Sequence, residues 1–488
     1  PERSMSDAEH ITSLTEDQDQ TSRQPWWLVA VFGFAIFTSA ALLFVVQPMT
    51  GKMLLPFVGG VPSGWVVAMA FFQTALLVGY LIAHLLAKLP PWHHGLAHLG
   101  LIVLAAISLP IALSPDLVTE QVVQQPALSV ITMLSVGVGL PFVVLAATGP
   151  TLQRLFAANR YGGSRDPYFL YAMSNVGSFV GLFAYPLVLE PTMGLDIQSL
   201  GWTMGYAALG LSAVGCLLMI NRAAKAELID GDSMAPPLTW RHRLMCIACA
   251  AIPSSLMLGV TTKITTDIAS TPMIWVVPLG LYLLTMILAF SKRQWVSNDL
   301  ILAAHPVLAV VAVISTLQGQ LNSSLAFVGI HLLAFTLISL SVHNRLAAMR
   351  PHPSRLTEYF LMLSLGGALG GVLTAFLAPV TFGWYWEYPM ALIASLLLLN
   401  STAKSPLIRT KLPMAAVVLV LVVIVSLTLM PDQVSGMLAV VAQAGFVLLA
   451  LAIMLLTVAP RFLAIALAVV AISVEIVAER SRAPASAN

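Results

Sequence analysis

Long apolar runs dominate this sequence and restrict it to one broad class of fold. An α-helix needs about 20 apolar residues to cross a bilayer. Only 9% of the 488 residues are charged, whereas a soluble domain carries about 25%. The sequence therefore predicts an all-α polytopic membrane protein of fourteen or fifteen helices, with apolar runs at 26–46, 64–87, 96–114, 129–152, 168–190, 198–220, 243–262, 272–291, 299–316, 324–343, 357–380, 388–400, 413–430, 436–457 and 461–477.

The lysines and arginines are divided unevenly between alternate loops. On the side of the N-terminus lie 19 of the 23, and the opposite side, here called the far side, holds Lys52, Lys263, Arg480 and Arg482. Loops rich in basic residues stay in the cytoplasm. The pattern therefore predicts a cytoplasmic N-terminus. Residues 1–25 are polar and do not resemble a signal peptide. A net charge of +2 gives no reason to expect nucleic acid as a partner.

The chain resembles itself at an offset near 191 residues. The run that begins Arg154-Leu155 matches Arg345-Leu346, and Tyr168-Phe169-Leu170 matches Tyr359-Phe360-Leu361. Two copies in the same orientation predict a major facilitator-like six-plus-six helix pseudo-repeat, followed by two or three further transmembrane helices. The expected parts are a cytoplasmic tail (1–25), a first bundle (26–220), a cytoplasmic linker (221–242), a second bundle (243–400), additional helices (401–478) and a tail (479–488).

Small residues at helical spacing recur in the fifth and eleventh predicted helices. Small residues allow two helix backbones to approach closely in a membrane. The pattern therefore predicts tight helix packing at Ser174, Gly177 and Gly181, and at Ser364, Gly367 and Gly371 in the second copy.

The stretch Gln47–Lys52 is unusual because it places polar residues and Pro48 at the end of the first apolar run. Proline disrupts a helix interior, so we expect a broken backbone here. Broken backbone at membrane depth is tolerated only where protein or a wet cavity covers it. The alternative is an interfacial cap in which Lys52 reaches the lipid headgroups.

Polar side chains gather on the first and fourth helices of each predicted bundle, which line the central cavity of a six-plus-six transporter. Intramembrane polar groups are costly, so a functional site is the default expectation. The predicted substrate site contains Gln47, Lys52, Thr148, Gln153, Lys263, Thr266 and Asp267. No motif predicts a catalytic residue, a metal or a cofactor.

A charge pair or gate is predicted from Lys263, Asp267 and Glu358. Lys263 and Asp267 are four residues apart and can pair on a continuous helix. The alternative is that the two charges only neutralise each other and stabilise the end of the helix. Glu190 is expected to be an exposed carboxylate at a helix end, and His94 to lie in a solvated loop.

Several stretches resemble one known family. The runs at 47–56, 166–175, 253–262, 265–269 and 363–367 are similar to the membrane half of the bacterial fused major facilitator/spermidine synthase-like proteins. The resemblance covers about residues 27–400 and implies a bacterial inner-membrane location. The nucleoside-binding loop and paired aspartates of a synthase domain are missing, so we expect no enzyme activity of that kind.

Two functions remain open at this stage. The first is a secondary transporter of a small anionic, zwitterionic or polyamine-related metabolite in the lipid bilayer. The second is a non-transporting scaffold subunit that docks a separate synthase-like protein or a membrane complex. A membrane-embedded enzyme acting on lipid is weaker, since only Lys263 and Asp267 could serve it.

Overall fold

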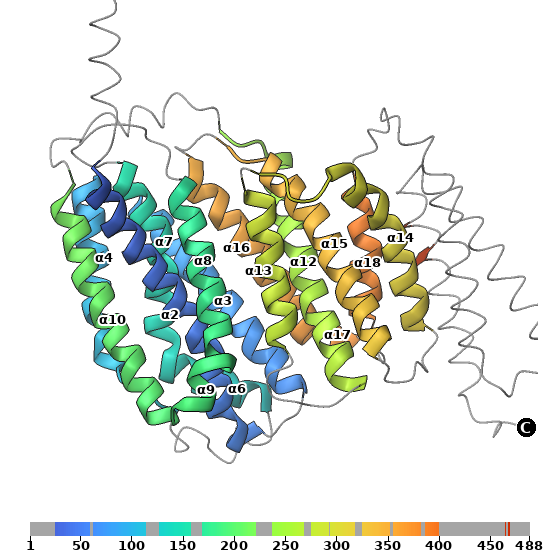
Figure 1. The fold of residues 1–488 in the computed structure, drawn as a ribbon, viewed down its shortest axis with the longest axis horizontal. Helices are drawn as coiled ribbons and strands as arrows, with labels where there is room; N and C mark the ends of the chain where they lie inside the picture. The colour runs from blue at the N-terminus through green and yellow to red at the C-terminus, as the bar shows by residue number, and fades with distance from the viewer. Residues whose placement is uncertain are drawn as a thin grey trace, which may run out of the picture. The chain divides into compact units, whose positions relative to one another are not determined.

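The computed structural model describes residues 25–58, 62–113, 126–157, 168–220, 237–267, 275–291, 293–317, 325–351, 355–381 and 386–399, together with 464, 467 and 468. Within these ranges the chain forms helices joined by short segments (Figure 1). Seven of the described helices are long and apolar enough to cross a membrane. Three shorter apolar helices accompany them. The protein is therefore an all-α polytopic membrane protein.

Helices occur in each of the first six predicted runs. Their bounds are α2 (Trp26–Val58), α3 (Pro62–Leu86), α4 (Pro91–Ala105) with η1 (Ala106–Ser108), α6 (Pro126–Leu134), the π-helical turn η3 (Ser135–Gly139), α7 (Leu140–Ala157), α8 (Tyr168–Ala184), the π-helical turn η4 (Tyr185–Leu189), α9 (Glu190–Thr192) and α10 (Leu195–Leu218).

The next six predicted runs also contain helices. These are α12 (Trp240–Asp267), α13 (Val276–Phe290), α14 (Asn298–Leu317), α15 (Leu325–Ala348), α16 (Leu356–Val372), the π-helical turn η6 (Leu373–Leu377), α17 (Ala378–Thr381) and α18 (Glu387–Leu397). The additional helices predicted after residue 400 lie outside the described residues, apart from 464, 467 and 468.

The predicted break at Gln47–Lys52 is wrong, because α2 continues through Pro48 and Pro56. Thr50 Oγ1 donates to the carbonyl oxygen of Val46 at 2.8 Å and lies 3.0 Å from that of Gln47. Membrane helices tolerate proline where side-chain hydroxyls and neighbouring helices support the affected turn. The polar stretch is therefore the last part of a long helix, and Lys52 projects from that helix.

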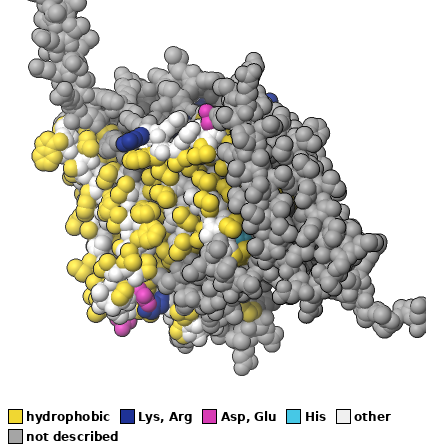
Figure 2. All heavy atoms as spheres, turned by 45° about the vertical axis from the view of Figure 1, so that its right-hand side comes forward, with side chains coloured by type: hydrophobic (Ala, Val, Ile, Leu, Met, Phe, Trp, Pro, Cys, Tyr) yellow, Lys and Arg dark blue, Asp and Glu magenta, His cyan; other side chains and the backbone are white. Residues whose placement is uncertain are grey.

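The chain divides into two compact units. One comprises residues 1–244 and 350–365, and the other comprises 245–349 and 366–488. Residues 356–365, nearly three turns of α16, thus belong to the first unit, although the predicted bundles place that helix wholly in the second. On the face drawn in Figure 2, hydrophobic side chains cover the middle and charged ones lie toward the upper and lower margins. A membrane-spanning surface has this distribution.

In the first unit, α2 and α8 pack backbone against backbone. A Cβ atom on Gly177 would lie 2.5 Å from the carbonyl oxygen of Phe37, and one on Gly181 would meet that of Ala41. Only glycine fits so close to another helix's backbone. These contacts hold the first and fifth helices of the unit together along their length.

In the second unit, α12 and α16 repeat this arrangement with a different pair of glycines. A Cβ atom on Gly366 would meet the carbonyl oxygen of Ile247, and one on Gly370 would meet that of Ala251. Gly367, which the sequence comparison selected, has no atom within 4 Å of its added Cβ. Its carbonyl oxygen instead accepts a hydrogen bond from Ser254 at 2.9 Å. The predicted register was therefore one residue off, because one glycine was aligned with its neighbour.

The two copies also share a local irregularity. A π-helical turn follows α8 at Tyr185–Leu189, and another follows the equivalent helix α16 at Leu373–Leu377. Each turn leads into a short helical end, α9 or α17. Together with the glycine contacts, this repeat gives the chain a major facilitator-like order of six helices followed by six.

Candidate functional site

Lys52 forms an ion pair with Glu190 inside the first unit. Its Nζ lies 2.7 Å from Glu190 Oε1, and about one third of each side chain is exposed. The π-helical turn η4 ends immediately before Glu190, so the carboxylate is carried by the widened end of the α8 segment. Glu190 is thus a specific partner of Lys52, at a helix end where the sequence predicts an exposed carboxylate.

Lys263 lies in the last two turns of α12, in the second unit. Its Nζ is 5.6 Å from the ring centroid of Phe327 on α15, within the range of a cation–π contact. The helix continues to Asp267, so the two residues share one helical strip. The side chains of Thr266 and Asp267 lie outside the described residues, and the predicted Lys263–Asp267 pair stays a prediction.

Thr148 faces the inside of the first unit, and so does Thr151. Thr148 Oγ1 donates to the carbonyl oxygen of Val144 at 2.9 Å, so it accepts from His98 Nε2 at 3.1 Å. Thr151 Oγ1 lies 3.1 Å from His94 Nε2, and the direction of this hydrogen bond depends on the tautomer of His94. Both histidines are buried, which corrects the expectation that His94 lies in a solvated loop. The helix α4 begins at Pro91, early enough to carry His94 into the packed interior.

Gln47 and Gln153 are both buried in the first unit. Gln47 Nε2 donates to the carbonyl oxygen of Leu43 on its own helix at 3.2 Å. Gln153 is on α7, two residues after Thr151, and is 4% exposed. The predicted residues of the first unit are therefore spread over three places: the Lys52–Glu190 end, the Gln47 turn of α2, and the α4–α7 contact.

Two histidines of the second unit each join three helices. His331 on α15 lies 3.1 Å from Ser315 Oγ on α14 and 3.0 Å from the Tyr388 hydroxyl on α18. His305 on α14 has the reverse connection, to Ser341 on α15 at 3.0 Å and Ser395 on α18 at 2.8 Å. These rings are fully buried.

The hydroxyl groups fix the tautomer of each of these rings. Ser315 donates to the carbonyl oxygen of Ala312, and Ser395 donates to that of Leu392. Each serine must therefore accept from a histidine Nε2–H, which leaves Nδ1 as an acceptor. A neutral imidazole satisfies both bonds, so the pair acts as a polar clamp on α14, α15 and α18.

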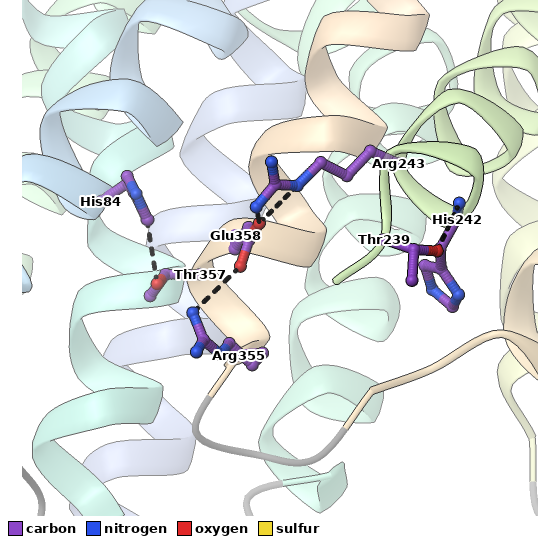
Figure 3. Close-up of polar contacts among 7 residues, drawn as sticks. All are labelled: His84, Thr239, His242, Arg243, Arg355, Thr357 and Glu358. Atoms are coloured by element: carbon purple, nitrogen blue, oxygen red, sulfur yellow. Dashed lines mark hydrogen bonds and ion pairs between the residues drawn. The ribbon is translucent and has the colours of Figure 1, made fainter. Parts of the chain in front are cut away.

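Glu358 has partners other than those predicted. Its Oε1 lies 2.6 Å from an Arg243 terminal nitrogen and 2.8 Å from Arg243 Nε, and its Oε2 lies 3.5 Å from Arg355 (Figure 3). Glu358 therefore pairs with arginines in this structure, and a gate that includes the far-side lysines stays a prediction. The physical reason is position: Glu358 is in the first turn of α16 and Arg243 in the first turn of α12.

The same end of α16 contacts α3 and α8. Thr357 Oγ1 lies 3.2 Å from His84 Nδ1 (Figure 3). Phe360 stacks on Tyr171 with centroids 5.6 Å apart, and it meets Tyr80 at 6.2 Å. The start of α16 is thus held by polar and aromatic contacts to helices far away in sequence.

Sequence reasoning missed Glu190 as a partner of Lys52, and it missed the histidine contacts. A signal for the α4–α7 contact exists, since His94 and His98 are four apart and Thr148 and Thr151 three apart. Both spacings place side chains on one helical face. No comparable local signal connects Lys52 with Glu190, which is 138 residues away.

Comparisons with known proteins find structural likeness only. No family model matches the chain, and no curated protein matches it. The human organic anion transporter MFSD10 (TETRAN) matches at 14% identity over 90% of this chain and 100% of that one, with a TM-score of 0.48. The xylose transporter XylE from E. coli, in a partially occluded inward open conformation, matches at 10% identity over 77% and 97%, with a TM-score of 0.49.

A POT family transporter in complex with 5-aminolevulinic acid matches at 12% identity over 78% of this chain and 97% of that one, with a TM-score of 0.46. None of these three scores reaches 0.5. The function proposed below therefore rests on the chain's own helices and side chains.

Proposed function

We propose that this protein is a secondary transporter of the bacterial inner membrane, with its N-terminus in the cytoplasm. Its two repeated sets of six helices would rock about a site near the middle of the membrane. The order of helices and the repeated α2–α8 and α12–α16 contacts support this proposal. The observation that carries it is the Lys52–Glu190 pair, a partly exposed pair of opposite charges in a chain with few charges.

The chemistry of the pair favours a zwitterionic substrate. A ligand that takes one partner of the pair leaves the other charge without its ion-pair contact; because about one third of each side chain is exposed, this loss is about 0.2–1 kcal/mol. A ligand with one amino group and one carboxylate can replace both partners at once, the carboxylate on Lys52 and the amino group on Glu190. A small anion can pair only with Lys52 and would displace Glu190 without compensation. A polyamine would leave Lys52 unpaired, so it fits least well.

Lys263 remains a candidate contact for the substrate carboxylate in the second unit. Gln47 and Gln153 are buried in places separate from the Lys52–Glu190 pair, and their predicted role as hydrogen-bonding groups of the site stays a prediction. Thr148 is reassigned to the helix contact with His98. The resemblance to the fused major facilitator/spermidine synthase-like proteins stays part of the proposal for family, and it assigns no substrate.

Thermal unfolding of the full purified chain in detergent tests the substrate class first. Zwitterionic amino acids, dicarboxylates and polyamines are added separately, and a substrate raises the unfolding midpoint by mass action. We expect zwitterions to give the largest shift. The active compound is then followed by uptake into proteoliposomes.

The matched variants are Lys52→Ala, Glu190→Gln and the exchange K52E/E190K. The exchange keeps an ion pair of the same residues but reverses its direction. We expect the exchange to keep the wild-type unfolding midpoint without ligand and to lose uptake. Wild-type uptake by both Lys52→Ala and the exchange would remove the pair from the site.

A second candidate is the scaffold subunit, and one observation favours it. The polar residues of the histidine clamp on α14, α15 and α18 satisfy one another inside the second unit, since both ring nitrogens of His305 and of His331 have hydrogen-bond partners. Such groups need no ligand. Gentle purification from the native host separates the two functions: a stoichiometric partner protein supports the scaffold, and a lone chain whose midpoint shifts with a zwitterion supports the transporter.

A further inference from the structure

The Lys52–Glu190 pair has two buried polar neighbours that the proposed function does not use. Glu190 follows the π-helical turn η4, and its backbone N–H donates to the carbonyl oxygen of Tyr185, the first residue of that turn. Gln198 lies near the start of α10, and its Nε2 donates to the carbonyl oxygen of Leu189. All of these residues belong to the first compact unit. The two neighbours are therefore attached to the short segment that carries the carboxylate of the pair.

The Tyr185 hydroxyl is a buried donor with no acceptor among the described residues. It lies beside the Gln198 side chain and close enough to Glu190 to be influenced by its charge. Gln198 Nε2 gives its two hydrogens to the carbonyl oxygens of Leu189 at 3.3 Å and Met193 at 2.8 Å. Carbonyl oxygens accept and cannot donate, so these contacts fix the orientation of the amide. They leave no N–H of Gln198 for the hydroxyl.

Gln198 Oε1 is the complementary case, because it is a buried acceptor without a donor among the residues that the structure describes. A buried polar atom that makes no hydrogen bond loses its hydration without compensation. The Tyr185 hydroxyl and Gln198 Oε1 do not bond to each other, so each can bond to another group. The first unit thus places one unused donor and one unused acceptor next to a pair of opposite charges.

A zwitterion with a primary amino group matches all four of these groups. Its carboxylate has two oxygens, one for Lys52 and one for the Tyr185 O–H. Its ammonium group has three N–H donors, of which one can reach Glu190 and another Gln198 Oε1. A trimethylated ammonium carries the same charge but has no N–H to donate. It would leave the amide oxygen unpaired inside the site.

We propose that Tyr185 and Gln198 complete the substrate site at the Lys52–Glu190 pair and select primary amines over quaternary ones. This inference rests on the proposed function, because it assumes that a zwitterion replaces the ion pair. The hydroxyl and the amide oxygen are buried, whereas about one third of each charged side chain is exposed. A ligand therefore meets the pair first and reaches the two buried atoms as the pair opens.

Unfolding of the full purified chain in detergent tests the selectivity. Glycine, alanine and γ-aminobutyrate are compared with their N,N,N-trimethyl derivatives over a range of concentrations, and binding is measured from the rise of the unfolding midpoint. We expect the primary amines to bind at least about tenfold more tightly than their trimethyl derivatives, because a hydrogen bond to a charged group contributes about that factor.

Tyr185→Phe removes the hydroxyl and keeps the ring. Because the hydroxyl has no acceptor among the described residues, the variant should unfold without ligand at or above the wild-type midpoint. It should bind the primary amines about tenfold more weakly. Tyr206→Phe is the matched control, because the Tyr206 hydroxyl is also buried but donates to the carbonyl oxygen of Ile102 at 3.1 Å. That variant should have a lower midpoint without ligand and unchanged binding of the amines.

The outcomes distinguish this inference from the proposed function. If no zwitterion of either kind raises the midpoint, the proposed function is wrong and the inference falls with it. If amines and trimethyl derivatives bind equally, and Lys52→Ala abolishes both responses, the function stands and the inference alone is wrong. Wild-type binding by Tyr185→Phe would also overturn the inference alone. An equal loss of binding in Tyr185→Phe and Tyr206→Phe would do the same, because it would show a general effect on the fold.

Discussion

Lys52 Nζ and Glu190 Oε1 are 2.7 Å apart, although 138 residues separate them in the sequence. The pair joins the far end of α2 to the segment that follows α8, two helices already in contact through Gly177 and Gly181. Its position is therefore determined by helix packing, and the charges are placed opposite one another by that packing. This relationship leads to the first prediction.

A double-mutant cycle with Lys52→Ala and Glu190→Gln should give a coupling of about 0.2–1 kcal/mol in the free energy of unfolding. The value is small because about one third of each side chain is exposed and water screens the pair. The measurement is unfolding in detergent of the wild type, the two single variants and the double variant. A coupling above about 3 kcal/mol would show a buried pair instead.

Much of the helix order could be predicted from the sequence, because membrane length and apolar composition leave few alternatives. Twelve runs up to residue 400 contain helices. The predicted break at Pro48 is wrong. Local propensity predicts a break at this residue, but packing against α8 and the hydrogen bond of the Thr50 hydroxyl maintain the helix. The repeat located the glycine-rich helices but misaligned one pair by a residue, because adjacent glycines at 366 and 367 look alike in sequence.

The candidate site was less predictable. The sequence assigns the polar residues to helices, but it does not predict which neighbouring helix each side chain faces. That depends on the rotation of each helix within the bundle. Thr148 was expected to line a cavity, and it faces His98. Glu358 was expected to meet a far-side lysine, and it meets Arg243 at the other end of the helices. Pairings between distant segments are properties of the tertiary structure.

Glu358→Gln should destabilise the protein by about 2 kcal/mol, because it removes the carboxylate that Arg243 and Arg355 both contact. Glu358 is 12% exposed and lies between both arginines. Arg355→Gln should cost only about 0.3 kcal/mol, since its contact is 3.5 Å long and spans one helical turn. Unfolding midpoints of the two variants provide the test. An equal loss would mean that Arg355 contributes as much as Arg243.

Tyr388→Phe should destabilise the second unit by about 1 kcal/mol, because it removes one donor and leaves His331 Nδ1 with an unmade bond. Ser395→Ala removes the acceptor of the His305 Nε2–H and leaves that donor with an unmade bond, so it should have an effect of similar size. Unfolding of each single variant and of the pair is measured. The two effects should be nearly additive, since they act on different histidines; strong coupling would contradict two separate contacts.

Neighbouring glycines of α16 provide a matched test of the helix contact. Gly366→Ala places a methyl group against the carbonyl oxygen of Ile247, and backbone in a packed helix pair cannot move aside without strain. We expect a loss of about 1–3 kcal/mol. Gly367→Ala introduces the same methyl group one residue further on, where no atom lies within 4 Å. There the change should be neutral or should stabilise the helix by up to about 1 kcal/mol, since alanine loses less backbone entropy than glycine.

The first unit repeats the comparison at Gly181, whose added Cβ would meet Ala41, so Gly181→Ala should behave like Gly366→Ala. Unfolding midpoints of the three variants decide between the two registers: if Gly367→Ala is the damaging change and Gly366→Ala is silent, α16 faces α12 with the other glycine.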